Sequence, residues 1–160
     1  MKKKVLSGLL ALALVVTSGA SMIPAYTAEA EELGTTYYVS SIDGDDSNDG
    51  LSEDKAFATL DKINEITLQP GDEVLLEKGS VFEDQALHIK GSGSEEAPII
   101  VSTYGEGDRP QINTNGHGQW YQNYGGHLDN TNHKWKGTVS SSILLMDVEY
   151  IEISGLEITN

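Results

Sequence analysis

The sequence contains no cysteine, and only 10 of its 160 residues are Lys or Arg. The absence of cysteine excludes disulfide bonds, so stability must come from packing or from bound ions. Set against 25 Asp and Glu residues, the few basic residues leave a formal net charge of −15. A surface this acidic repels phosphates and anionic lipid headgroups, which excludes nucleic acid as a partner. A neutral oligosaccharide or polysaccharide remains compatible with it.

Long hydrophobic runs are also scarce, and the clearest one lies near the N-terminus. Three lysines precede an apolar run over residues 5–16, and Ala28-Glu29-Ala30 matches a small-residue cleavage site, with Ala20 and Ala25 as alternatives. A basic start followed by an apolar run of this length is typical of a signal peptide and is short for a membrane span. We therefore expect cleavage of residues 1–30, a secreted or cell-surface location, and no membrane contact after cleavage.

Removing that segment makes the balance of charge still more negative. It takes away three lysines and one glutamate, so 7 basic and 24 acidic residues remain, and 7 − 24 = −17. A polyanionic substrate would need a basic patch or bridging cations on such a surface. This charge counts against polyuronates as substrates.

The rest of the chain alternates short β-forming runs with turn-forming clusters. A first strand is expected at residues 35–40 and an acidic loop at 43–50. One short amphipathic helix is expected where apolar residues recur every three positions, at Phe57, Leu60, Ile63 and Ile66. Pro70-Gly71-Asp72 ends this helix. Further strands are expected at 73–77, 86–90, 98–103, 110–113, 143–146, 150–154 and 156–159.

No tight two-residue hairpin joins any two of these strands, and the pattern favours a solenoid. Near the C-terminus, apolar residues face one way across a single-glycine corner, and acidic residues face out. The apolar set is Ile151, Ile153, Leu156 and Ile158, and the acidic set is Glu149, Glu152 and Glu157. In a parallel β-helix, such inward aliphatics stack coil over coil. We predict an all-β, right-handed parallel β-helix in which residues 31–72 form the first strand, acidic loop and capping helix, and residues 73–160 form the first coils.

A segment at residues 115–136 interrupts the strand rhythm and is predicted to be a long loop. It carries the aromatic residues Trp120, Tyr121, Tyr124 and Trp135. These side chains suit stacking on sugar rings, and they suit packing of the loop against the scaffold equally well. The histidines of the segment have spacings that fit no zinc template.

The acidic loop contains half of a calcium-binding motif. Asp45, Ser47 and Asp49 provide oxygen ligands at alternate positions, and Gly50 follows them. However, the twelfth position from Asp45 is Ala56, where a calcium loop of this kind has a bidentate Glu. Two hypotheses stay open for these residues, a calcium site and a solvated turn.

Three stretches together resemble a known family: YYVSSIDGDDSNDGLSEDKAFATLDKI, PGDEVLLEKGS and GSGSEEAPIIVSTYGEGDRPQI. They look like the first segment of right-handed β-helix enzymes of the pectate-lyase-like superfamily. The continuation through GQWYQNYGGHLDN to SSILLMDVEYIEISGLEITN is most similar to β-helix lacto-N-biosidases, which release lacto-N-biose from milk and mucin-type glycans.

The resemblance implies a glycoside hydrolase acting on host or milk oligosaccharides, of which this chain is the N-terminal portion. The family's catalytic residues would lie C-terminal to Asn160, so the β-helix would be incomplete at its C-terminus. A second chain that completes it is one expectation. Two alternatives remain: a polysaccharide lyase on the same scaffold, and a non-catalytic surface module that binds glycans through its aromatic residues.

Overall fold

The computed structural model describes residues 34–116, 119–123 and 136–160, with the backbone alone for 119–123 and 136–140. Residues 32–160 form one compact unit. The predicted signal peptide, residues 1–30, lies outside the described residues. Among the residues that are described, no helix has the length and apolar character needed to cross a membrane.

Parallel strands form three sheets. The first sheet has the order β1-β2-β5-β10, with β1 at Thr36–Val39, β2 at Glu73–Glu77, β5 at Ile99–Tyr104 and β10 at Ile151–Ile153. The second sheet has the order β11-β6-β3, with β3 at Val81–Glu83, β6 at Gln111–Asn113 and β11 at Glu157–Thr159. The third sheet pairs β4 at Leu87–Ile89 with β9 at Ile143–Leu145.

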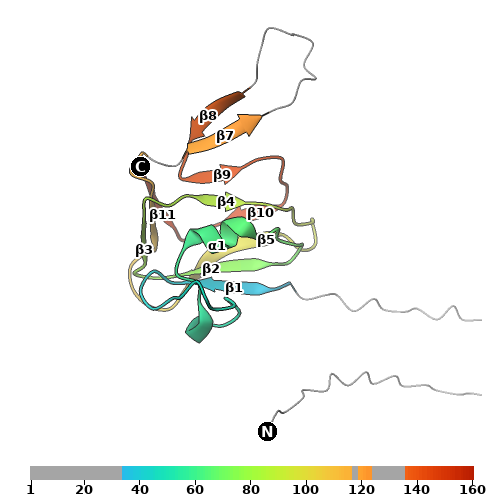
Figure 1. Cartoon of the computed structure of the whole chain (residues 1–160). Helices are drawn as coiled ribbons and strands as arrows, with labels where there is room; N and C mark the ends of the chain where they lie inside the picture. Colours follow the sequence, from blue (N-terminus) through green and yellow to red (C-terminus); the bar gives the residue numbers. More distant parts are fainter. Residues whose placement is uncertain (1–33, 117–118, 124–135) are drawn as a thin grey trace, which may run out of the picture. The chain divides into compact units, whose positions relative to one another are not determined.

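The chain visits these sheets in a fixed order, which Figure 1 shows. It runs through β2, β3 and β4, then through β5, β6 and β9, and then through β10 and β11. The strands of each pass lie beside those of the pass before, so equivalent residues of successive passes are stacked on one another. The predicted strands are confirmed, each within one residue at either end.

The core consists of aliphatic rows that run across the stacked strands. In the first sheet, Val74 pairs with Val101 and Val101 with Ile153. In the second sheet, Phe82 pairs with Ile112. The side chains of Phe82, Val74, Val101 and Ile112 are each 0 % exposed, so these rows are excluded from water.

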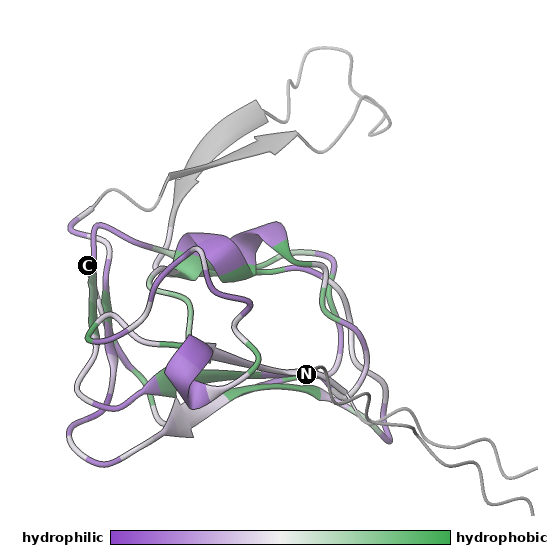
Figure 2. Cartoon of the chain, turned by 60° about the horizontal axis from the view of Figure 1, so that its bottom comes forward, coloured by the Kyte–Doolittle hydropathy of each residue, from purple (hydrophilic) through white to green (hydrophobic). Residues whose placement is uncertain are grey.

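The predicted amphipathic helix is present but shorter than its apolar stripe. Helix α1 spans Leu60–Glu65, and its buried residues are Leu60 and Ile63. Figure 2 shows its apolar side turned toward the sheets and its polar side turned away. Phe57 instead forms an isolated parallel bridge with Val39, and Ile66 follows the helix in extended conformation. A 3₁₀ turn, η1, occupies Glu53–Lys55.

One prediction about an irregular segment is wrong, and one strand was not predicted. The 115–136 segment is not a continuous loop, because β7 at Gln119–Asn123 pairs antiparallel with β8 at Lys136–Ser140. Its β-forming residues find a partner beyond a long connection, so no tight-turn signal marks the hairpin. Strand β3 was also not predicted, because only Phe82 of its three residues is buried and so short a run shows no alternation.

Candidate functional site

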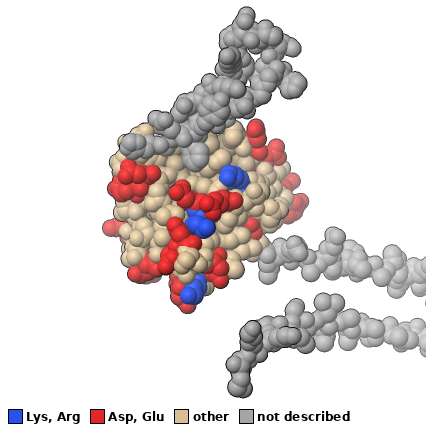
Figure 3. All heavy atoms as spheres, viewed as in Figure 1, with Lys and Arg blue, Asp and Glu red and all other residues tan. Residues whose placement is uncertain are grey.

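The described surface is rich in carboxylates, as Figure 3 shows for one face, where Asp and Glu far outnumber the basic residues. Glu149, Glu152 and Glu157 are exposed, which confirms the predicted outward direction of these side chains. Exposed carboxylates suit hydrogen bonds with sugar hydroxyls and repel other anions. The site is therefore best sought where such groups are fixed in place.

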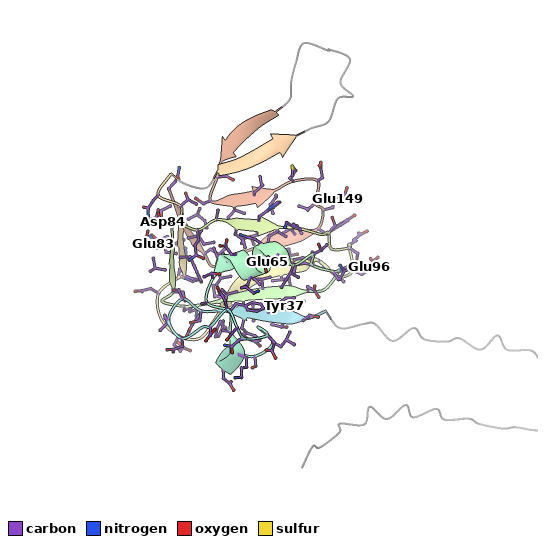
Figure 4. All side chains as sticks on the ribbon, in the orientation of Figure 1. Tyr37, Glu65, Glu83, Asp84, Glu96 and Glu149 are labelled. Atoms are coloured by element: carbon purple, nitrogen blue, oxygen red, sulfur yellow. The ribbon has the colours of Figure 1, made fainter. Side chains whose placement is uncertain are left out.

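One such place is a polar corner made of Glu83, Asp84, Asn113 and Asn115, between the second and third sheets. The Asn113 and Asn115 side-chain amides donate to Oε2 of Glu83, at 3.0 and 2.8 Å. The Asn115 amide also donates to Oδ1 of Asp84, at 3.0 Å. Figure 4 shows Glu83 and Asp84 at the same end of the molecule, opposite Glu96 and Glu149.

The backbone explains why these residue types occupy the polar corner. Asp84 and Asn115 adopt left-handed conformations, with φ values of 57° and 47°. Among residues other than glycine, Asp and Asn tolerate this region best, because their short polar side chains bond locally. The chain can therefore turn sharply there while keeping a carboxylate and an amide at the surface.

Beside the polar corner lies a second set of polar contacts. Oδ1 of Asn160 accepts hydrogen bonds from the Gly116 N–H, at 2.9 Å, and from the Thr114 hydroxyl. The Ser142 hydroxyl donates to the Thr159 carbonyl at 2.8 Å. These bonds fix the chain on both sides of the β7–β8 hairpin, which leaves the second sheet after Gly116 and rejoins the third before Ser142.

The predicted sugar-stacking residues fall in and around this hairpin. Trp120 and Tyr121 lie on β7, at backbone positions paired with Val139 and Thr138. Tyr124 and Trp135 lie outside the described residues, as does His117. The stacking role of the four aromatic residues remains a prediction. The structure adds that two of them belong to a strand that the polar corner leads into.

In the acidic loop, two of the three predicted calcium ligands already accept backbone hydrogen bonds. The Ser47 N–H donates to Oδ1 of Asp45 at 2.8 Å, and the Leu51 N–H donates to Oδ1 of Asp49 at 3.1 Å. The backbone hydrogen bond from Ser47, followed by one from its side chain, lowers the pKa of Asp45. These are Asx turns, which a loop of this composition forms without a metal.

Metal binding is not further supported elsewhere in the described part of the chain. No group of three or more His, Cys, Asp or Glu side chains there is arranged to hold a metal ion. The calcium site at Asp45, Ser47 and Asp49 stays a prediction.

Sequence reasoning missed the most heavily used carboxylate of this loop, Asp46. Its Oδ1 accepts from the backbone N–H groups of Ala58 and Thr59, at 2.8 and 3.0 Å, and its Oδ2 accepts from the Thr59 hydroxyl at 2.8 Å. Because Thr59 is the N-cap of α1, Asp46 ties the acidic loop to the start of the helix. No local pattern marks Asp46, since its partners lie 12 and 13 residues away.

The far end of the first sheet carries a row of interacting polar and aromatic residues. The Ser40 hydroxyl donates to the Glu77 carboxylate, and the Tyr38 and Tyr104 rings meet edge to face with centroids 5.2 Å apart. Burial raises the pKa of the Tyr104 phenol to about 12, and the carboxylates of Glu77 and Glu53 add to the rise. This row stabilises the stack of β1, β2 and β5.

Two crystal structures of a GH136 lacto-N-biosidase from Eubacterium ramulus, native and selenomethionine-labelled, match the chain with a TM-score of 0.68 and 53 % sequence identity. The match covers 79 % of this chain and 20 % of that one. The fold described above is therefore that of a segment of this class of enzyme.

The sequence comparison agrees. A lacto-N-biosidase of Bifidobacterium longum subsp. longum is 52 % identical over 141 residues, which covers 84 % of this chain and 9 % of that protein. No protein-family model matches the chain. The chain is thus homologous to the GH136 lacto-N-biosidases, and it spans about a fifth or less of the length of these relatives.

Proposed function

We propose that the chain supplies part of a secreted glycoside hydrolase of lacto-N-biosidase type that acts on host or milk oligosaccharides. The observation that carries this proposal is the 53 % identity with a solved GH136 lacto-N-biosidase over 79 % of the chain. Identity at this level, maintained over stacked strands of the same arrangement, indicates a shared role within the enzyme. The acidic surface accords with a neutral glycan as the substrate.

The fold we propose is a right-handed parallel β-helix of the pectate-lyase-like superfamily. Three features support it: all three main sheets are parallel, the chain visits them in a repeated order, and aliphatic rows run from turn to turn. In this arrangement α1 occupies the place of a third-sheet strand in the first turn. It is therefore the proposed cap at the leading end.

We place the catalytic groups of the proposed enzyme outside these 160 residues. Glycoside hydrolysis by the usual route uses two carboxyl groups about 5 to 9.5 Å apart, one on either side of the scissile bond. In the polar corner, the carboxylates of Glu83 and Asp84 are held by the amides of Asn113 and Asn115, which suits them to scaffolding.

Further turns of the proposed β-helix would pack on the side of β9, β10 and β11. Leu145 and Ile158 align in register with buried Ile89 and Ile112, yet they are 47 % and 44 % exposed. The same polypeptide or a second chain can provide those turns. Trp120 and Tyr121, together with Tyr124 and Trp135, are the proposed glycan contacts.

A chimera tests this function. The segment of the Eubacterium ramulus enzyme that matches this chain is replaced by the corresponding residues of this chain, and release of lacto-N-biose from lacto-N-tetraose is measured. We expect the chimera to retain activity and the chain alone to have none. A chimera that folds, as judged by circular dichroism, and yet is inactive would contradict the shared role. Turnover by the chain alone would contradict the placement of the catalytic groups.

A further inference from the structure

Helix α1 meets the third sheet through an unusual set of hydrogen bonds centred on Asn64. The Asn64 side-chain amide donates from Nδ2 to the Ala86 carbonyl at 2.9 Å. Its Oδ1 accepts from the His88 backbone N–H at 2.7 Å. Both bonds therefore join one helical side chain to the backbone of β4.

This pair of bonds is the pattern that a neighbouring parallel strand would make. In a parallel ladder, one residue donates to the carbonyl before its partner and accepts from the N–H after it. The partner position here is Leu87, which lies between Ala86 and His88. The other edge of β4 is already paired, since the Leu87 N–H donates to the Ser142 carbonyl of the β9 side at 2.9 Å. The Asn64 carboxamide thus stands where a peptide group of another strand would stand.

Two further contacts hold the helix over this edge at its two ends. Oε1 of Gln85 accepts from the Leu60 N–H at 2.9 Å, at the start of α1. The Lys90 ammonium donates to the Asn64 carbonyl, at the end of α1. Beyond the helix, the Leu68 N–H donates to the Lys90 carbonyl at 2.9 Å. The β4 edge is consequently bonded to α1 and its following residues at Ala86, His88 and Lys90.

The first sheet is closed in a comparable way by backbone groups. The N–H groups of Tyr38 and Ser40 in and after β1 donate to the carbonyls of Gly50 and Phe57, both at 2.8 Å. There a segment of chain pairs directly with the edge strand. At β4 the chain is helical, and a side-chain amide makes the equivalent bonds.

We propose that Asn64 blocks the addition of another strand to the edge of β4 that faces α1. Loss of the Asn64 side chain would open this edge to β4 of a second copy of the chain. An edge strand with unpaired N–H and C=O groups is a template for pairing with another chain, and proteins block such edges with charges or covering elements. The Asn64 carboxamide makes the hydrogen bonds that the Ala86 carbonyl and the His88 N–H would offer to another strand, and α1 covers the edge. This inference rests on the fold and does not depend on the proposed function.

The test compares three variants of the full chain with the wild type by light scattering after size exclusion, at several protein concentrations. Asn64→Ala removes both edge bonds, and we expect its mass to rise with concentration above that of the wild type. Asn64→Asp loses the donor to Ala86 but places a charge at the edge, and we expect it to keep the wild-type mass despite lower stability. Asp61→Ala changes an exposed residue of the same helix and is the matched control.

Hydrogen exchange of the His88 amide locates the effect. We expect faster exchange in Asn64→Ala at low concentration, where it is monomeric, and renewed protection as the mass rises. Three results would overturn the proposal: Asn64→Ala stays at the wild-type mass while folded, Asn64→Asp associates as much as Asn64→Ala, or both variants unfold. The last result would make Asn64 a residue required for folding and leave no role for it as an edge block.

Discussion

Truncation of Leu60 tests whether α1 is an integral part of the core. Leu60 is 0 % exposed and belongs to the same buried cluster as Leu87 and Ile89 of β4. The change Leu60→Ala removes about three carbon groups, each worth ~0.8 kcal/mol when buried, so the transfer loss alone is ~2.4 kcal/mol. A residual cavity adds to this, and buried Leu→Ala changes in other proteins cost about 2 to 5 kcal/mol.

We therefore expect Leu60→Ala to lower the free energy of unfolding by ~3 kcal/mol, measured by urea denaturation. The dependence of this free energy on urea concentration should be unchanged. Asp61→Ala, next to it on the exposed side, is the control and should shift the free energy by no more than ~0.5 kcal/mol. If the two variants differ by less than ~1 kcal/mol, the helix is not packed as a core element and its role as a cap is wrong.

Three other predictions concern single side chains. Asp72 is 4 % exposed, and its carboxylate accepts hydrogen bonds from the Thr35 and Gln69 N–H groups at 2.7 and 2.8 Å. Asp72→Asn should therefore lower the free energy of unfolding, measured in urea, by ~1–3 kcal/mol. A change within error would show that these hydrogen bonds are dispensable. The pKa of Tyr104 is raised in the folded state to about 12, so the stability that its protonated phenol contributes is complete below pH ~10 and is lost between pH ~10 and 12. Over this window, the melting temperature of Tyr104→Phe should therefore fall less than that of the wild type. Equal losses would refute the raised pKa. If Asp45, Ser47 and Asp49 bind calcium, adding Ca²⁺ should raise the melting temperature of the wild type but not of Asp45→Asn/Asp49→Asn, and an unchanged wild-type melting temperature would reject the site.

The sequence predicted the strands well because local pattern and turn chemistry agree there. Alternation in β2 gives buried Val74 and Leu76 between partly exposed neighbours, and Gly79 and Gly91 have the positive φ values that their turns require. It predicted the helix less well, because the stripe at Phe57, Leu60, Ile63 and Ile66 mixes helical and extended residues. All four side chains contact the core, and periodicity alone does not show whether a helical or an extended backbone places them there.

The polar contacts were much harder to predict, since they join residues that are distant in sequence. Asn113 and Asn115 bond to Glu83 across 30 and 32 residues. Asn64 bonds to Ala86 and His88 across 22 and 24 residues. Such pairs depend on the register of stacked turns, which a single sequence does not specify. Only the preference of Asp84 and Asn115 for left-handed backbone had a local signal.

The exposure of Ile158 shows that a side chain can share a row with buried residues and still not be buried. Ile158 pairs with Ile112, which pairs with Phe82, so all three side chains share one row of the second sheet. Ile112 and Phe82 are 0 % exposed, whereas Ile158 is 44 % exposed. Alternation along each strand therefore sets the direction of a side chain, but burial depends on what covers the end of the stack, since Phe82 on the edge strand β3 is buried with a neighbouring strand on one side only. The same reasoning applies to α1, because the leading end of the third sheet is buried only while Leu60 and Ile63 cover it and Asn64 satisfies its edge.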